Sequence, residues 1–342
     1  MRTRRLAHSS SNPTPSGLRA RSAQAGVGGA LGSRSLRTKG PRAEGHHVPV
    51  LLHESLEALL LQKNDVVVDA TLGGGGHAKA IAELLDPSGT LIGIDADEAA
   101  VERTYQALSY TQSTPKTHLI VANFRALSDV LRNLKVEHIT KALFDLGWSS
   151  YQLRAGRGFS FLTDEPLLMT YAADITPQTL TAKQIVNAWE EHNIADVIYG
   201  WGEERYSRRI AKAIVEARRK KPIQTARELS EIITRAVPKA YAHGKLHPAT
   251  RTFQALRIAV NDELGALREG LAAAWNALSS GGRLAVITFH SIEDREVKHL
   301  MRAWKNDGAG TLVTRSPIRA SRDEIRENPR ARSAKLRVIE KI

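Results

Sequence analysis

The chain has 342 residues, of which 42% are hydrophobic and 25% charged, the proportions of an ordinary globular protein. It contains no cysteine, which excludes disulfides, cysteine-ligated zinc and thiol nucleophiles, and no apolar run is long enough to predict a membrane span. The formal net charge of +13 favours an anionic partner.

The charge is concentrated at the N-terminus. Residues 1–45 hold nine Arg or Lys residues and one acid, Glu44, so the remaining chain carries only +5. This segment is rich in Ser, Gly and Arg and shows no apolar periodicity, which predicts disorder. Two other interpretations stay open, a nucleic-acid-binding arm and an organellar transit peptide. We expect a cytoplasmic protein, or an organellar one if this segment is a transit peptide.

From His47 onward, the pattern is typical of a doubly wound α/β sheet. The continuous β-branched run at Val66 predicts a strand buried on both faces. Strands are predicted at Val66–Ala70, Thr90–Asp95, His118–Ala122 and Ala142–Leu146, and helices at Glu54–Leu61, His77–Leu85, Glu98–Leu108 and Leu127–Leu134.

The alternation stops between Arg154 and Asn261, where the pattern predicts helices and no strand. One helix is expected at Glu203–Arg219, and a capping box at Thr225 opens another at Glu228–Val237. Strands return at Arg283–Phe289, Thr311–Thr314 and Lys335–Ile339. We therefore expect a sheet-bearing domain made of 46–153 and 262–342, with a helical domain, 154–261, inserted into it.

The turn Gly73–His77 joins the first strand to a helix. Glycines there let a ligand approach the main chain, and the helix N-terminus presents free N–H groups. The spacing matches neither a dinucleotide fingerprint nor a P-loop. Asp95, which ends the second strand, can accept hydrogen bonds from both hydroxyls of a ribose. Together they indicate a cofactor that contains adenosine, either NAD or S-adenosyl-L-methionine.

A candidate catalytic loop, Asp145–Gln152, follows the fourth strand. The exocyclic N4 of cytosine is a poor nucleophile, since its lone pair is conjugated with the ring. Asp145 and nearby carbonyls can accept hydrogen bonds from the N–H groups of such an amine, and Trp148 can stack on a base. The alternative is that Trp148 packs in the core.

His290 follows the next strand, at the same edge of the sheet. It is a candidate general base or substrate-binding residue, and a structural role is equally open. The Ser and Asp residues near it lack the nucleophile elbow of a hydrolase. No residue spacing in the sequence predicts a metal site.

Three basic clusters suit contacts with RNA phosphates. The candidate RNA-binding residues, besides Trp148, are Arg208, Arg209, Arg251, Arg257 and Arg332. Each cluster alone is more often a solvated surface.

Long blocks of the chain, in order, are similar to those of one family. They include His47–Leu52, Gly73–His77, Gly93–Asp95, Asp145–Gly147, Arg157–Phe161, Thr250–Ile258, Asn261–Leu264, Phe289–Lys298 and Asn328–Arg337. From about His47 to Ile342 the chain resembles the MraW/RsmH family, the N4-cytosine methyltransferases of bacterial small-subunit ribosomal RNA.

The resemblance implies a Rossmann-like class I methyltransferase fold in which the inserted helical domain recognises the substrate. It implies S-adenosyl-L-methionine as cofactor and a cytidine in the decoding region of small-subunit (16S) rRNA, or of the small ribosomal subunit, as target. By position, the cofactor-binding residues are Gly75, Gly76, His77, Asp95, Phe124, Asp145 and Gln152, with Gly73 and Gly74 shaping the turn. Asp145 is therefore also a candidate catalytic residue. A homodimer is a further expectation for the assembly.

The chain departs from the family at Gln152–Arg154, at an insertion in Gly200–Gly202, in its long basic N-terminal segment, and in a segment near the expected substrate. The family's Leu-Asp-Met-Arg-Met-Asp is replaced by the sequence of Leu167–Ala172, which removes an acid and a base together. Three alternatives remain open: methylation of organellar rRNA, methylation of DNA cytosine, and a non-catalytic RNA-binding assembly factor.

Overall fold

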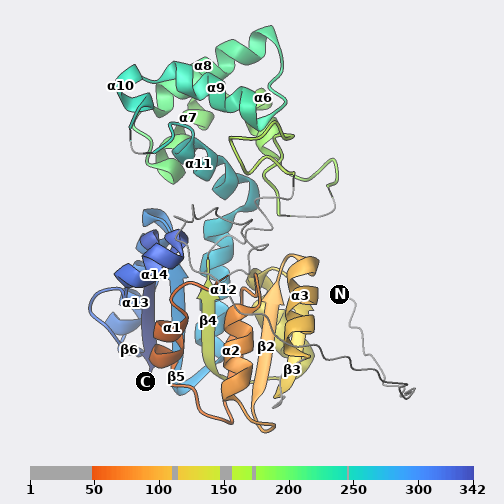
Figure 1. The fold of residues 1–342 in the computed structure, drawn as a ribbon, viewed down its shortest axis with the longest axis vertical. Helices are drawn as coiled ribbons and strands as arrows, with labels where there is room; N and C mark the ends of the chain where they lie inside the picture. Colours follow the sequence, from red (N-terminus) through yellow and green to blue (C-terminus); the bar gives the residue numbers. More distant parts are fainter. Residues whose placement is uncertain (1–47, 110–114, 147–155, 172–174, 245) are drawn as a thin grey trace, which may run out of the picture. The chain divides into compact units, whose positions relative to one another are not determined.

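The structure is a computed structural model that describes residues 48–109, 115–146, 156–171, 175–244 and 246–342. Within these ranges seven strands form one sheet in the order β3-β2-β1-β4-β5-β7-β6 (Figure 1). The strands are β1 (Val66–Asp69), β2 (Thr90–Asp95), β3 (Lys116–Val121), β4 (Ile139–Asp145), β5 (Leu278–Thr288), β6 (Gly310–Leu312) and β7 (Lys335–Lys341).

The first five strands run parallel, and β7 is antiparallel to both β5 and β6. The chain leaves β1 towards β2 and β3 and then returns to β4 on the other side of β1. In an open α/β sheet, ligands bind at the carboxyl ends of the strands where the order reverses in this way.

Helices cover both faces of the sheet (Figure 1). α1 (Leu52–Leu59), α2 (Gly76–Leu84) and α3 (Glu98–Leu108) share one apolar cluster, and α4 (Leu127–Leu134), α12 (Glu263–Ala277) and α13 (Ser291–Asn306) share the other. Successive strand residues supply opposite faces: Val67 belongs to the first cluster and Val68 to the second, as do Leu143 and Phe144. Continuous apolar strands follow from burial on both sides.

Between β4 and α12 the described segments contain helices and one isolated bridge, Pro166 to Thr225. The helices are α6 (Ala182–Ala188), α7 (Glu191–Gly202), α8 (Ser207–Lys220), α9 (Ala226–Ala236), α10 (Lys239–Ala242) and α11 (Thr250–Asn261). They bury an apolar cluster of their own, which runs from Phe159 to Leu256. The remaining short elements are η1 (Phe124–Ala126), α14 (Arg322–Glu327) and η2 (Pro329–Ser333).

The predicted elements are confirmed in type, with β2, α3 and α4 also confirmed at both ends. The helix expected at Glu203–Arg219 is present as α8, but it begins four residues later than predicted, at Ser207, because the preceding helix α7 extends to Gly202. Glu203 takes a left-handed conformation with φ of 51°, which ends the helix and turns the chain. In the described part of the chain, no helix is both long and apolar enough to cross a membrane.

The Thr225 capping box is present as predicted. The Thr225 hydroxyl accepts a hydrogen bond from the Glu228 amide, and the Glu228 carboxylate accepts one from the Thr225 amide. Replacing Thr225 with Ala should lower the free energy of unfolding by about 1 kcal/mol, measured as the midpoint of a urea transition. Ser316→Ala, at an exposed loop position, is the control and should change the midpoint little; equal midpoints for both variants would contradict the capping role.

Candidate active site

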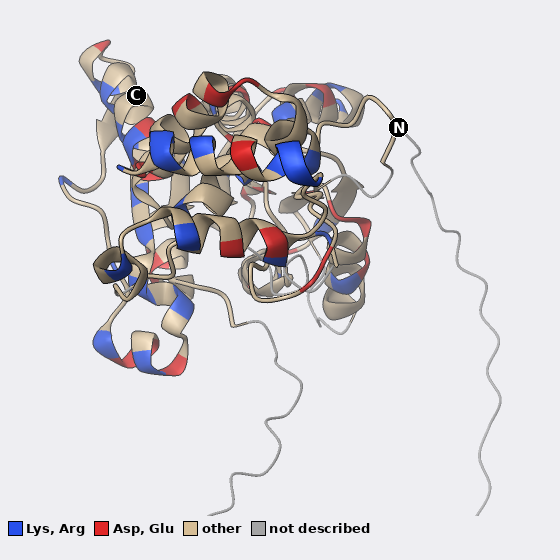
Figure 2. Ribbon diagram, turned by 90° about the horizontal axis from the view of Figure 1, so that it is seen from above, with Lys and Arg blue, Asp and Glu red and all other residues tan. Residues whose placement is uncertain are grey.

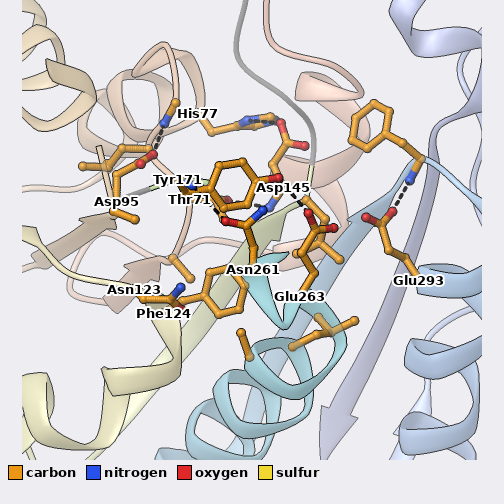
Figure 3. Close-up of a pocket in the computed structure, with 18 of the residues that line it drawn as sticks. Thr71, His77, Asp95, Asn123, Phe124, Asp145, Tyr171, Asn261, Glu263 and Glu293 are labelled. Atoms are coloured by element: carbon orange, nitrogen blue, oxygen red, sulfur yellow. Dashed lines mark hydrogen bonds and ion pairs between the residues drawn. The ribbon is translucent and has the colours of Figure 1, made fainter. Parts of the chain in front are cut away.

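A cavity of about 380 Å³ opens at the carboxyl ends of β1, β2 and β4, a volume within the usual range of ligand pockets. Figure 3 shows side chains from these strand ends and from the start of α12 converging on it. Its lining residues are Pro49, 70–74, Gly76, His77, Asp95, Ala96, Asn123, Phe124, Asp145, Leu146, Tyr171, Arg257, Asn261, Glu263, Leu264, Ala266, Leu267, Phe289, Glu293, Arg330 and Ser333.

The glycine turn forms one wall of the cavity. Gly73, Gly74 and Gly76 line it, whereas Gly75 does not. Gly75 precedes α2 with φ of 77°, and a Cβ there would lie 2.9 Å from the Thr104 hydroxyl, so both conformation and space require glycine. Gly73 has a left-handed φ of 53°, so it shapes the turn as expected and also lines the cavity, whereas the cofactor contact expected of Gly75 stays a prediction.

Asp95 stands at the rim where predicted. One of its carboxylate oxygens accepts a hydrogen bond from the Gly73 amide at 2.8 Å and the other from the Asp97 amide at 2.9 Å. Burial raises the pKa of Asp95, and these two amide bonds oppose that effect. Each carboxylate oxygen has a second lone pair, so Asp95 is held rigidly and can still accept from a ligand.

Phe124 lies beside Asn123, after β3. Its ring packs edge-on against Phe144, with centroids 5.7 Å apart and planes at 74°. An added Cβ on Gly270 would meet the Phe124 ring at 2.7 Å, which shows how closely α12 supports that ring. Phe124 therefore presents a fixed apolar surface to the cavity.

The cavity holds acidic groups and a histidine that stays neutral. The His77 Nδ1 lies 3.7 Å from an Asp145 carboxylate oxygen, and burial lowers the pKa of His77 to about 4. Burial also raises the pKa of Asp69, which lies behind them at the end of β1. A neutral imidazole does not neutralise Asp145, so this part of the cavity favours a cation.

A buried ionic cluster forms the opposite wall. The Arg257 guanidinium holds the Glu263 carboxylate through two contacts, of 2.5 and 2.7 Å. The Tyr171 hydroxyl donates to the same carboxylate at 2.9 Å, and the Asn261 side chain accepts from the Tyr171 amide at 2.8 Å. Burial alone would lower the pKa of Arg257, but the Glu263 charge outweighs it and the pKa is raised. Arg257 is only 7% exposed and its charge is engaged by Glu263, so its expected contact with RNA phosphate stays a prediction.

His290 caps α13 instead of facing the cavity. It accepts a hydrogen bond from the Glu293 amide, and its Nε2 lies 2.9 Å from a Glu293 carboxylate oxygen. His290 is not among the lining residues, while Glu293 is. This arrangement supports the structural interpretation of His290 over a general base.

Glu263, His290 and Glu293 place potential metal-ligand atoms within 4.8 Å of one another. The residue spacing did not predict this grouping, because Glu263 begins α12 whereas His290 and Glu293 stand at the start of α13. Arg257 already binds Glu263 and lies 3.9 Å from Glu293. Its guanidinium supplies the positive charge that a metal ion would otherwise bring.

The other predicted RNA-binding residues lie away from this wall. Arg208 and Arg209 are exposed on α8, Arg251 donates to the Glu203 carbonyl at 2.9 Å, and Arg332 is exposed in η2. Figure 2 shows blue and red segments interspersed along the helices, so basic residues are mixed with acids. Trp148 and Gln152 lie outside the described residues.

A family model described as the MraW methylase family matches residues 44–342. This chain belongs to the MraW methylase family. Relatives named ribosomal RNA small subunit methyltransferase H are 46% identical in Symbiobacterium thermophilum and 42% in Brevibacillus brevis, covering 87% of this chain and 97% and 98% of theirs. The relative of that name in Deinococcus radiodurans is 48% identical over 86% of this chain and 89% of its own length.

Four residues that line the cavity of this MraW family member were not predicted as site residues from the sequence: Tyr171, Asn261, Glu263 and Glu293. Asn261 and Glu263 stood inside a family block, and Glu293 beside His290, but nothing in their spacing showed which side chains would turn inward. Tyr171 stands in the segment that departs from the family and still reaches Glu263.

The lowered pKa of His77 predicts a pH effect on stability. Between pH 6.5 and about 4 the unfolded chain binds a proton on this group that the folded chain does not, so the folded state loses stability as pH falls. Relative to His77→Gln, the wild-type protein should lose about 3 kcal/mol between pH 7 and pH 4. Urea unfolding at each pH measures this, with His53→Gln, at an exposed position, as control. Parallel curves for wild type and His77→Gln would refute the assignment.

Proposed function

We propose that this chain transfers the methyl group of S-adenosyl-L-methionine to the N4 amino group of a cytidine in the decoding region of small-subunit (16S) rRNA. Family membership and the names of the relatives support the reaction and the RNA. The observation that carries the proposal is the meeting of Asp95, Asp145 and the glycine turn in one cavity at the switch point of the sheet.

The cavity fits this cofactor in charge and shape. S-adenosyl-L-methionine has a sulfonium and an ammonium, and the cavity presents Asp95 and Asp145. His77, which lines the cavity, has a buried Nε2 with no hydrogen-bond partner within the described residues, which is costly unless a ligand or water satisfies it. Gly73, lacking a Cβ and with open space beside it, leaves room along that wall.

The residues proposed to hold the cofactor are Gly76, His77, Asp95, Phe124 and Asp145. When bound, the cofactor supplies a methyl group on an activated, positively charged sulfur. Asp95 would accept hydrogen bonds from the ribose, and the Phe124 ring would pack against the adenine. Gln152 stays a proposal from the family pattern alone.

Asp145 is the proposed proton acceptor. Its amide is fixed by the Thr71 hydroxyl at 2.7 Å, at the end of a buried strand. A carboxylate that accepts an N–H of the target amine localises the nitrogen lone pair and later takes the released proton. The protein otherwise contributes by positioning, since the sulfonium leaves as a neutral thioether.

We propose that 46–153 and 262–342 form the methyltransferase domain and that the helical domain, 154–261, recognises RNA. The separate apolar cluster of the helical part supports this division. Because the proposed substrate is ribosomal RNA, we propose that the enzyme works in the cytoplasm, or in an organelle if residues 1–45 act as a transit peptide. A homodimer stays a prediction.

The two aspartates should separate binding from turnover. Asp95→Ala should weaken binding of S-adenosyl-L-methionine about tenfold or more, since hydrogen bonds to a charged group are lost. Asp145→Asn keeps the shape and removes the charge, so it should also lower turnover about a hundredfold. Calorimetry and single-turnover assays measure these effects. Asp129→Asn, on an exposed turn of α4, is the control. If Asp95→Ala and Asp145→Asn were both as active as this control, the site assignment would be wrong.

The substrate is tested with ribosomal RNA from a strain that lacks the gene. Mass spectrometry of small-subunit rRNA should show loss of the N4-methylcytidine signal, and the wild-type gene should restore it while the Asp145→Asn gene should not. An unchanged signal in the deletion strain would exclude this function.

A further inference from the structure

A second cavity, of about 360 Å³, lies in the helical part of the chain. It is lined by Arg205, Tyr206, Pro238, Ala240, Tyr241, Gly244, Leu246, His247 and Arg251. No acidic residue lines it, although two arginines do. The function proposed above leaves this cavity without a role.

The aromatic side chains of this cavity are held in place. The Tyr241 hydroxyl donates to Glu204, which is fully buried and also accepts from the Tyr206 amide at 2.8 Å. The Arg205 guanidinium lies 4.8 Å from the centre of the Tyr206 ring and 5.1 Å from that of Tyr241. The His247 ring stacks on Phe161, with centroids 4.4 Å apart and planes at 10°. A planar ligand would therefore meet prearranged planar groups.

Two arginines line the cavity, whereas the adjacent acid Glu204 is buried and is not among the lining residues. Glu203, the nearest exposed acid in sequence, already binds Ser291 and Arg295. α8 and α11 begin next to the cavity, after Tyr206 and Ala249, and neither helix has a side-chain cap at its N-terminus. The Ser207 and Thr250 amides at these helix starts already donate to the Glu204 and His247 carbonyls, so the two arginines are the groups that suit a phosphate. Rings and an anion site together match a nucleotide.

One helix joins this cavity to the candidate active site. Arg251 lines the second cavity near the start of α11, while Arg257 and Asn261 line the first cavity near its end. From Arg251 to Asn261 the helix spans about 15 Å, a length that a few nucleotides of an extended single strand can bridge. α11 thus keeps the two cavities at a fixed separation.

We propose that the second cavity binds a nucleotide of single-stranded RNA, a few nucleotides away from the methylated cytidine on the same strand. This inference rests on the proposed function. It adds a second contact that selects RNA strands long enough to occupy both cavities, and it explains how a cytidine in a strand is preferred over a free one.

The first test measures RNA binding by the full chain. Fluorescence anisotropy with a labelled single-stranded RNA of about a dozen nucleotides and one central cytidine should give a Kd about tenfold higher for Arg205→Ala. The Kd of Arg205→Lys, which keeps the charge but lacks the planar guanidinium, should lie between those of Arg205→Ala and wild type. His247→Ala should also weaken binding. Arg132→Ala, which removes an exposed charge on α4, is the matched control. An Arg205→Ala affinity equal to that of Arg132→Ala would overturn the proposal.

The second test uses strand length. For methyl transfer to the longer RNA, Arg205→Ala should raise KM about tenfold with kcat at saturation unchanged, because the residue does not line the active-site cavity. For a dinucleotide containing cytidine, too short to reach both cavities, the variant and wild type should have equal KM. An equal rise in KM for both substrates would overturn the proposal.

The binding test does not depend on methyl transfer. If wild-type protein methylated no RNA but lost RNA affinity through Arg205→Ala, the cavity assignment would stand and the proposed function would fall. If methyl transfer were intact and Arg205→Ala changed neither Kd nor KM, the function would stand and the cavity assignment would fall.

Discussion

The buried pair between Arg257 and Glu263 holds the structure around the candidate active site together. Arg257 belongs to α11 and Glu263 to α12, and the chain passes between them through Asp262 in a left-handed conformation with φ of 45°. Removing two charges from water is costly. Here the cost is offset by a two-contact geometry and by the Tyr171 hydroxyl and Glu293 nearby.

This cluster connects two parts of the chain that have separate apolar cores. Tyr171, Arg257 and Asn261 belong to the helical part, whereas Glu263, Glu293 and His290 belong to helices packed on the sheet. A buried charge needs its partner at close range, so the pair restricts how α11 can meet α12. The wall of the active-site cavity depends on that junction.

The facing wall is organised by hydrogen bonds from the backbone. The parallel strands bring Asp69, Asp95 and Asp145 to one edge, and the glycine turn donates an amide to Asp95. Acids on neighbouring strand ends raise one another's pKa. At Asp69 the pKa is raised mainly by burial and further by the nearby Asp145 and Asp95 carboxylates. The result is a site lined by Asp95 and Asp145, with a neutral histidine beside Asp145, which suits a cationic ligand and an amine that must lose a proton.

The sequence by itself determined the strand and helix types, the place of the glycine turn, Asp95 and Asp145, and the family. Those signals are local: β-branched runs, a capping box and motif order each lie within a few residues. Only the tertiary structure decided that Arg257 is a buried partner of Glu263, that His290 caps a helix, and that Gly73 and Gly74 line the cavity whereas Gly75 does not. It also decided that α11 spans two cavities. These outcomes depend on which side chains from distant segments meet and lose water, and no local pattern encodes that.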